Sequence, residues 1–179
     1  GQYGIDPARV GVWGGSAGGH LTALTALSCG DTSLDAAPAV AGSECVQAAV
    51  TWYGVFDFKS MLARGGGNVA ENALLRCTPA NCSDQAVRAV SPSSYVDAKD
   101  PPFLLIHGET DAVVPVSQSR DVEAKMKAAG MTVESIYIPG VDHSFIGATP
   151  AETRAATLKA AGVTRTGTRR RVRRTSRRG

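Results

Sequence analysis

The stretch Val10-Gly11-Val12-Trp13-Gly14-Gly15-Ser16-Ala17-Gly18-Gly19-His20-Leu21 sets a glycine-flanked serine between a short apolar segment and a run rich in Ala, Leu and Thr. A G-x-S-x-G pattern in this context is typical of a serine at the tip of a sharp turn from a strand into a helix. Gly14 and Gly18 would remove the side chains that collide at so tight a bend. The stretch therefore predicts a strand over residues 10–13 and a helix over residues 17–27.

Further along the chain, short β-rich runs alternate with helical patterns. Three more strands are predicted, over residues 48–53, 102–107 and 132–138. One helix is predicted from Ser117, taken as its N-cap, to Gly130, and another from the Thr149-Pro150-Ala151-Glu152 capping box to just before Gly162. Two excursions, over residues 31–42 and 64–94, interrupt the pattern. The alternation favours an α/β fold of about four mostly parallel strands flanked by helices.

Composition limits the class of protein. The chain has 179 residues, of which 43% are hydrophobic and 20% charged, and this fits one globular domain. No apolar run approaches the roughly 18 residues of a spanning helix, so we expect no membrane span. The net charge of +3 is unevenly spread, because residues 165–179 hold 8 of the 19 basic residues and no acidic one. The first 164 residues carry 11 basic and 16 acidic residues, a net charge of −5.

The last sixteen residues consist of Arg, Thr, Ser and Gly with a single Val. Since such a segment can bury little apolar surface, we divide the chain into a domain of residues 1–163 and a disordered Arg-rich tail of residues 164–179. An arginine-rich arm can neutralise nucleic-acid phosphates. The tail lacks Lys and aromatic residues, however, and we favour an inert appendage or the product of a reading-frame shift over a nucleic-acid partner.

Ser16 is a candidate nucleophile, because the turn exposes its hydroxyl. The N–H of Ala17 and the positive end of the helix then face the point where an attacked carbonyl gains negative charge. A serine hydroxyl needs a base oriented by a carboxylate. His143 follows the last predicted strand and Asp111 the one before it, at the sheet edge where reactive groups gather. We predict that Ser16, Asp111 and His143 form a catalytic triad of nucleophile, acid and base, with Ala17 as an oxyanion donor.

Other titratable side chains near these positions have simpler interpretations. His20 lies inside the first helix, as a structural residue or a helper of the turn. His107 lies inside the third strand and is most simply a buried, hydrogen-bonded core residue. Glu109 competes for the role of triad carboxylate. Asp142 adjoins the predicted base and cannot easily reach its Nδ1, so we interpret it as a loop-ordering or solvent-facing residue, and Asp57 as loop-ordering.

The four cysteines form two local pairs. Cys29 and Cys45 flank the first excursion, and Cys77 and Cys82 enclose Thr-Pro-Ala-Asn. No C-x-x-C pair or nearby His completes a tetrahedral set, so we expect no metal and no other cofactor. We favour the disulfides Cys29–Cys45 and Cys77–Cys82 over free thiols. Disulfides persist in oxidising compartments, which favours a secreted or periplasmic protein, with a cytoplasmic location as the alternative.

Several segments carry a resemblance to a known family. They are Asp6-Pro7-x-Arg9-Val10-x-Val12-x-Gly14-Gly15-Ser16-Ala17-Gly18-Gly19-His20-Leu21, Ser91-Pro92 with Tyr95-Val96, Pro101-Pro102-Phe103-Leu104-Leu105-Ile106-His107-Gly108 with Asp111 and Val114-Pro115, and Gly140-x-Asp142-His143-Ser144-Phe145. The chain thereby resembles the carboxyl half of an α/β-hydrolase, from about Tyr3 to about Ala161. It looks most similar to bacterial carboxylesterases and lipase-like enzymes, including feruloyl- and acetyl-esterase-like members. Prolyl-oligopeptidase-type peptidases share the same catalytic half.

The chain departs from this family at its start. The family builds a second oxyanion donor on a glycine-rich loop, often His-Gly-Gly-Gly, after an earlier strand, whereas only fifteen residues precede Ser16. The missing strands would take on the order of 100 residues. We therefore expect an N-terminally truncated fragment with an unpaired apolar sheet edge. Loss of one oxyanion donor would cost about 3 kcal/mol of transition-state stabilisation.

The resemblance implies a serine hydrolase that cleaves small-molecule carboxylic esters through an acyl-enzyme. Two alternatives stay open: a serine peptidase of prolyl-oligopeptidase type, and an inactive fragment with a nucleic-acid-binding arginine tail. Trp52 and Tyr53, at the end of the second predicted strand, are candidate substrate-binding residues. Core packing explains them equally well.

Overall fold

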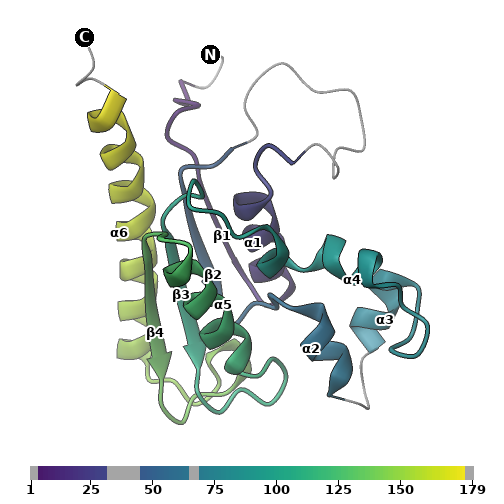
Figure 1. Cartoon of the computed structure of the whole chain (residues 1–179). Coiled ribbons are helices and arrows are strands. Elements are labelled where there is room, and N and C mark those ends of the chain that lie inside the picture. Colours follow the sequence, from purple (N-terminus) through teal and green to yellow (C-terminus); the bar gives the residue numbers. More distant parts are fainter. Residues whose placement is uncertain (1–3, 32–44, 65–68, 176–179) are drawn as a thin grey trace.

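The computed structural model describes residues 4–31, 45–64 and 69–175 (Figure 1). Strands alternate with helices along these residues, as the sequence predicts, and each strand lies within one or two residues of its predicted range. In chain order the elements are β1 (Gly11–Gly15), α1 (Ala17–Leu27), β2 (Ala48–Trp52), α2 (Phe58–Ala63), α3 (Val69–Leu75), α4 (Asp84–Val90), the 3-10 helix η2 (Pro92–Tyr95), β3 (Phe103–Gly108), α5 (Ser117–Ala128), β4 (Val133–Ile138), the 3-10 helix η3 (His143–Phe145) and α6 (Pro150–Thr175).

The four strands form one parallel sheet whose strand order, β1-β2-β3-β4, is the order of the chain. Every residue of the central strand β3 is buried, which explains its unbroken apolar run, because a strand covered on both faces needs no polar alternation. Parallel strands also end at the same sheet edge. The loops that follow β1, β2, β3 and β4 therefore meet there, and the fold confirms the α/β class.

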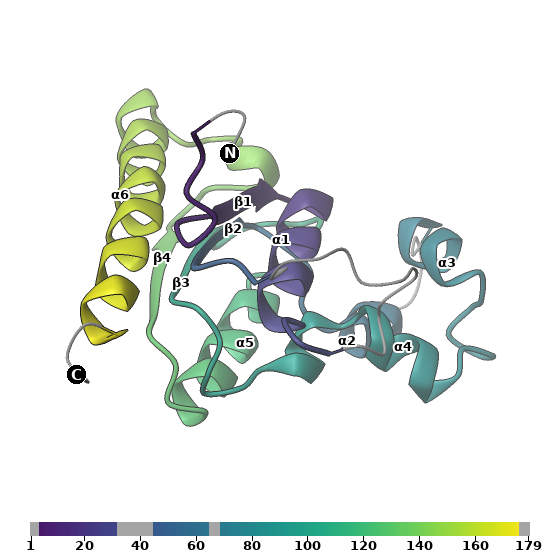
Figure 2. The same ribbon diagram turned by 90° about the horizontal axis from the view of Figure 1, so that it is seen from above.

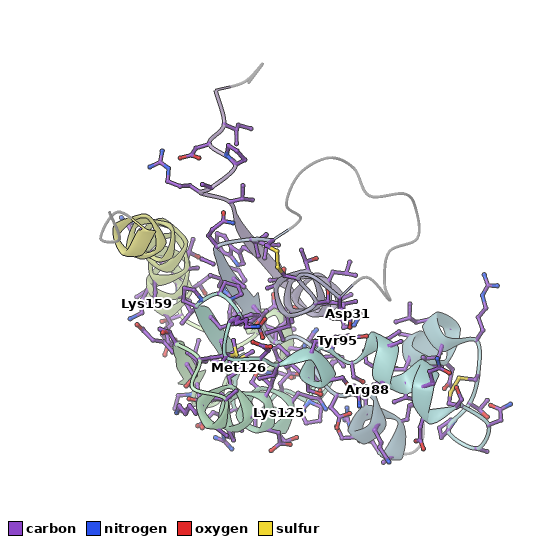
Figure 3. The ribbon with its side chains drawn as sticks, turned by 45° about the horizontal axis from the view of Figure 1, so that its top comes forward. Asp31, Arg88, Tyr95, Lys125, Met126 and Lys159 are labelled. Carbon is purple, nitrogen blue, oxygen red and sulfur yellow. A yellow bond between two sulfur atoms is a disulfide. The ribbon has the colours of Figure 1, made fainter. Side chains whose placement is uncertain are left out.

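Helices cover both faces of the sheet. Figure 2 shows α1 and α5 on one side and α6 on the other. Successive strand residues point to opposite faces, so Phe103 and Leu105 pack in the core under α1 and α5, while Leu104 and Ile106 pack in the core under α6. Met126 of α5 points into the first core and is fully buried (Figure 3). These two apolar layers hold the sheet rigidly between its helices.

The segment between β2 and β3 adds three short helices beside the sheet, α2, α3 and α4. They lie at one side of the molecule, beyond α1 (Figure 2). Val55, Met61 and Val87 belong to a small apolar cluster of their own here. The Gly65-Gly66-Gly67 part of this predicted excursion lies outside the described residues, as do residues 32–42 of the first excursion.

Both predicted disulfides are present. Cys29–Cys45 and Cys77–Cys82 each join Cα atoms 5.1 Å apart, within the range that a disulfide requires. The first links the end of α1 to the segment that leads into β2, and the second closes the turn between α3 and α4. The cysteines of this chain are therefore staples of two loops.

Two helix boundaries differ from the predicted ones. Val116, not Ser117, is the N-cap of α5, and no side chain caps it. The helix α6 continues through Gly162 to Thr175, whereas the sequence predicts an end before Gly162 and a disordered tail from residue 164. A single glycine costs a helix only about 1 kcal/mol, and arginine is a good helix former, so composition alone does not stop the helix there. Residues 176–179 lie outside the described residues.

Candidate active site

Ser16 stands at the junction of β1 and α1 with φ 54° and ψ −121°, a conformation that costs energy for any residue with a side chain. Its N–H donates to the Trp52 carbonyl at 2.9 Å, and its carbonyl accepts from the N–H of His20 at 3.0 Å. These two bonds hold the strained residue from the sheet side and from the helix side. The sharp strand-to-helix turn predicted from G-x-S-x-G is confirmed.

The glycines around Ser16 serve different purposes. A Cβ at Gly14 would lie 2.3 Å from the Gly18 carbonyl oxygen, and one at Gly19 would lie 2.9 Å from the Trp52 carbonyl oxygen. A Cβ at Gly18 would meet no atom outside its own helix within 4 Å among the described residues. The collision predicted at Gly14 is confirmed, whereas the prediction for Gly18 is wrong, because Gly19 is the residue that packs against the Trp52 carbonyl and Gly54.

The three predicted triad residues come together at the carboxyl edge of the sheet. His143 Nε2 lies 2.9 Å from Ser16 Oγ, and His143 Nδ1 lies 2.8 Å from Asp111 Oδ2. The Asp111 side chain is fully buried and that of His143 is 14% exposed. With Nδ1–H donating to the carboxylate, Nε2 is left as the acceptor of the serine hydroxyl proton. This arrangement can transfer a proton from Ser16 to His143.

Asp111 is held by the loop that follows β3. Its Oδ1 accepts from the N–H groups of Val113 at 2.9 Å and Val114 at 2.8 Å, which aims Oδ2 at His143. Glu109, the alternative carboxylate, forms an ion pair with Arg120 instead and is partly exposed. The structure therefore brings Asp111 to the imidazole and leaves Glu109 on the surface.

The loop that carries His143 is tied to the Asp111 loop through Asp142. The Asp142 Oδ1 accepts from the N–H of His143 at 2.7 Å and from that of Ala112 at 2.9 Å. These backbone bonds lower the pKa of the Asp142 carboxyl below its ordinary value, so it stays an acceptor over the neutral range. Asp142 orders the loop, as the sequence suggests, while Nδ1 of His143 bonds Asp111 instead.

Tyr53 follows β2 and packs against the triad. Its ring centroid lies 4.8 Å from that of His143 and 5.0 Å from that of Phe145. Burial raises the pKa of Tyr53, and a hydrogen bond from the Ser144 side chain opposes that shift. Trp52 instead packs between Trp13 and Phe145, at 4.7 and 4.9 Å. Tyr53 thus borders the imidazole, while Trp52 belongs to the aromatic packing beneath it.

The other two histidines are buried. His20 Nε2 lies 2.7 Å from the Val90 carbonyl oxygen, and burial lowers the pKa of its imidazole, so His20 is a structural link between α1 and α4. His107 is fully buried, as predicted, but its Nε2 also lies 3.2 Å from Asp111 Oδ2. Sequence reasoning missed that contact. The available signal is the four-residue spacing of His107 and Asp111 across the end of a strand.

A cavity of about 950 Å³ lies away from the triad, beside the Cys29–Cys45 disulfide. Its lining includes Asp31, Arg88 and Tyr95, which lie together at one side of the sheet in Figure 3. No triad residue lines this cavity, so the candidate active site is the triad itself and not this cavity. In the part of the chain that the structure describes, no group of His, Cys, Asp or Glu could hold a metal ion, and no helix is long and apolar enough to cross a bilayer.

A parallel sheet covered on both faces, with Ser, Asp and His in that chain order after β1, β3 and β4, defines an α/β-hydrolase. Comparison with known families agrees. The chain belongs to the BD-FAE family, whose model matches residues 1–126.

Relatives of the chain are esterases. It is 37% identical over 148 residues to Esterase LipQ of Mycobacterium tuberculosis, covering 80% of this chain and 34% of LipQ. A truncated carbohydrate esterase from gut microbiota superimposes with a TM-score of 0.72 at 26% identity, covering 91% of this chain and 62% of that one. Thermogutta terrifontis esterase 2 superimposes with a TM-score of 0.68 at 29% identity with propionate bound, covering 92% of this chain and 58% of that one. The sarin-phosphonylated form of the same esterase superimposes with a TM-score of 0.71 at 26% identity, covering 92% of this chain and 59% of that one. The chain spans about a third of the length of the curated relatives it matches.

Proposed function

We propose that this chain carries the catalytic triad of a serine carboxylic ester hydrolase. The observation that supports it most is the pair of distances around His143, 2.9 Å to Ser16 Oγ and 2.8 Å to Asp111 Oδ2. Ser16 Oγ attacks the acyl carbon while His143 Nε2 takes its proton, and Asp111 stabilises the resulting imidazolium. His143 then returns the proton to the leaving alcohol. Water, deprotonated by the same imidazole, releases the acid from the acyl-enzyme.

The oxyanion formed in each step needs hydrogen-bond donors. Ala17 is the first residue of α1, and the first N–H groups of a helix have no partner within the helix. Its N–H, together with the positive end of α1, is the donor that we assign to the oxyanion. The nucleophile, the oxyanion donor, the acid and the base are thus assigned to Ser16, Ala17, Asp111 and His143.

Short-chain esters are the substrates that we propose. LipQ and its relatives bear the name esterase, and Thermogutta terrifontis esterase 2 has structures with propionate and butyrate bound. No described residue favours a peptide substrate over an ester. A proline-containing aminoacyl amide therefore serves as the comparison substrate, and faster hydrolysis of that amide than of p-nitrophenyl acetate would replace the ester assignment.

Fluorophosphonate labelling tests the nucleophile. We expect the probe to label the chain, Ser16→Ala to abolish labelling, and Ser28→Ala, which alters a serine at the far end of α1, to leave it unchanged. The measurement is in-gel fluorescence after a fixed incubation, with intact-mass spectrometry to count the attached groups. Equal labelling of the Ser16→Ala chain would refute the assignment.

We also propose that the chain matures in an oxidising compartment. Two disulfides that each close a local loop support this, because reducing cytoplasm rarely keeps such bonds. Expression with and without an oxidising environment, followed by alkylation of free thiols, tests it. Four alkylated cysteines in active protein from an oxidising compartment would contradict it.

A further inference from the structure

His107 makes three polar contacts inside the core. It lies in β3, four residues before Asp111, with no exposed surface. Its Nε2 is 2.9 Å from the Val114 carbonyl oxygen and 3.2 Å from Asp111 Oδ2. Its Nδ1 is 2.7 Å from the hydroxyl of Ser119, a buried residue of α5. The ring thus connects α5, β3 and the loop that carries the triad carboxylate.

These contacts determine which nitrogen carries the proton. Both partners of Nε2 are acceptors, so Nε2 must hold the hydrogen, which is shared between the carbonyl and the carboxylate. Nδ1 then accepts from the Ser119 hydroxyl. Burial lowers the pKa of His107, against the opposing effects of Val114 and Asp111. The ring is therefore neutral at physiological pH, with one donor and one acceptor both engaged.

Asp111 Oδ2 is the acceptor for two imidazoles. It receives Nδ1–H of His143 at 2.8 Å and Nε2–H of His107 at 3.2 Å. Its other oxygen receives two backbone N–H groups, so both oxygens are fixed. A donor that shares Oδ2 withdraws part of the negative charge that would otherwise face His143.

We propose that His107 is a positioning residue of the triad: by donating from Nε2 to Asp111 Oδ2 it holds the carboxylate toward His143 and moderates the basicity of that imidazole. The proposal rests on the proposed function for its consequence in catalysis, but not for the hydrogen bond itself. Removing the donor leaves more negative charge facing His143 and stabilises its protonated form.

Several other groups face His143 and stay in place when His107 is changed. Asp111 comes from the loop after β3, Ser16 from the turn after β1, and Tyr53 from the residue after β2. The Asp142 carboxylate lies at the start of the loop that carries His143. Since the charges on these groups are the same in each variant at a given pH, a change in the His143 titration reports the loss of the His107 donor.

The chain offers a direct measurement, because it contains only three histidines. Nitrogen-15 labelling of histidine and long-range proton–nitrogen spectra reveal the tautomer and the titration of each ring. We expect His107 to be the neutral Nε2–H form at neutral pH. An Nδ1–H or charged His107 would overturn the proposal without any variant.

Two substitutions separate positioning from packing. In His107→Gln the amide Nε2 lies as many bonds from Cα as the imidazole Nε2, so it keeps a donor for Asp111. In His107→Asn the amide reaches only as far as Nδ1, toward Ser119. We expect His143 to stay protonated to higher pH in His107→Asn than in the parent chain, and the His107→Gln chain to lie between the two. His20→Gln removes a buried ring that bonds Val90 and should leave His143 unchanged.

Ester hydrolysis supplies the second readout. In His107→Asn we expect kcat to fall about tenfold with KM unchanged, with substantial recovery in His107→Gln. The proposal would be contradicted if the two variants gave identical His143 titrations, or if neither titration differed from that of the parent chain. If the parent chain shows neither hydrolysis nor fluorophosphonate labelling while the His143 shift appears, the proposed function fails and the positioning contact stands.

Discussion

Strained backbone gathers at the triad. The described residues contain five non-glycine residues with positive φ, and four of them, Ser16, Tyr53, Ser144 and Phe145, belong to the loops around His143. Each such residue costs about 1–3 kcal/mol and persists only where its surroundings fix it. Tyr53 is fixed by its N–H bond to the Ile106 carbonyl at 2.8 Å, and Phe145 by burial under α6. The rigid sheet therefore supports the conformations that place the reacting groups.

The glycine contacts yield a prediction about stability. Gly19→Ala places a methyl group 2.9 Å from the Trp52 carbonyl oxygen, so we expect a loss of about 1–3 kcal/mol in the free energy of unfolding. Gly18→Ala, the matched control, meets no neighbour outside its helix and should be neutral or stabilising by up to about 1 kcal/mol. Urea titration of both variants measures the difference. Equal destabilisation by the two would show that the close approach at Gly19 is absent.

The two carboxylates that follow β3 give a matched pair for catalysis. Asp111→Asn keeps the shape but loses the charge that stabilises the His143 imidazolium, so we expect kcat for p-nitrophenyl acetate to fall on the order of 1,000-fold or more. Glu109→Gln removes only a surface ion pair with Arg120 and should change kcat less than twofold. A Glu109→Gln chain as impaired as Asp111→Asn would reverse the assignment.

Much of the site follows from sequence because its members stand at strand ends. Ser16 carries its own glycine signature, and Asp111 and His143 follow from strand order. The packing of Tyr53 on the imidazole and the positive φ of Ser144 could not be predicted, because both depend on how separate loops meet in space. The same holds for the His107 contact, since a histidine inside an apolar strand looks like any buried core residue.

At the scale of elements, local hydrogen-bonding signals predict helix starts well when the side chain has no competing partner. Thr149 and Glu152 form the predicted capping box, with the Thr149 N–H donating to Glu152 at 2.7 Å and the Glu152 N–H donating to Thr149 at 3.2 Å. The N-cap predicted at Ser117 is wrong. Gln118, next to it, is buried and accepts from the N–H groups of Phe56 and Asp57, so tertiary contacts with the α2 segment set where α5 begins.

The turn before β3 supports a prediction about pH. Burial raises the pKa of Asp100 to about 6, although the Asp97 N–H bonded to its carboxylate opposes that shift. The folded chain then binds this proton more tightly than the unfolded chain, so stability falls as pH rises from about 4 to about 6 and stays lower above that window. We expect Asp100→Asn to raise the free energy of unfolding by about 1 kcal/mol at pH 8, a figure reduced for partial exposure, and to have little effect at pH 4.

Thermal unfolding of the Asp100→Asn chain at both pH values measures this effect. Asp84→Asn serves as the control, because that carboxylate is 98% exposed. The Asn amide oxygen can still accept from Asp97, so the comparison isolates the buried charge. Equal stabilisation at pH 4 and pH 8 would mean that the charge on Asp100 is not the cause.

At the scale of the whole molecule, one sheet serves both stability and chemistry. The two cores lie on its opposite faces, while Ser16, Tyr53, Asp111 and His143 all lie at its carboxyl edge. Because four adjacent parallel strands end together, residues up to 127 positions apart in the chain come within hydrogen-bond distance. The parallel sheet was predictable from the alternation of elements. Its strand order and the continuation of α6 to Thr175 were not, since alternation leaves the spatial order of strands open and tail composition alone suggests disorder.

The lateral edge of β1 supports a prediction about association in solution. Among the described residues β1 pairs with β2 alone, and its flank exposes Val10 by 37% and Trp13 by 42%. An apolar edge strand with open N–H and C=O groups templates pairing with another chain. We therefore expect chains of residues 1–179 to associate as concentration rises, with the sedimentation coefficient increasing across the micromolar range.

Val10→Lys should weaken this association, because a charge on an edge strand opposes strand addition. It leaves the Trp13 contact with Trp52 in place, so the fold is kept. Leu74→Lys changes a residue of α3 that is 54% exposed and remote from the edge, and it should leave association unchanged. The backbone hydrogen bonds of the pairing do not depend on the added charge, whereas salt screens that charge. Raising the salt concentration should therefore restore part of the association of the Val10→Lys chain. A monomer at every concentration, or an equal effect of the two lysines, would show that β1 is not the associating edge.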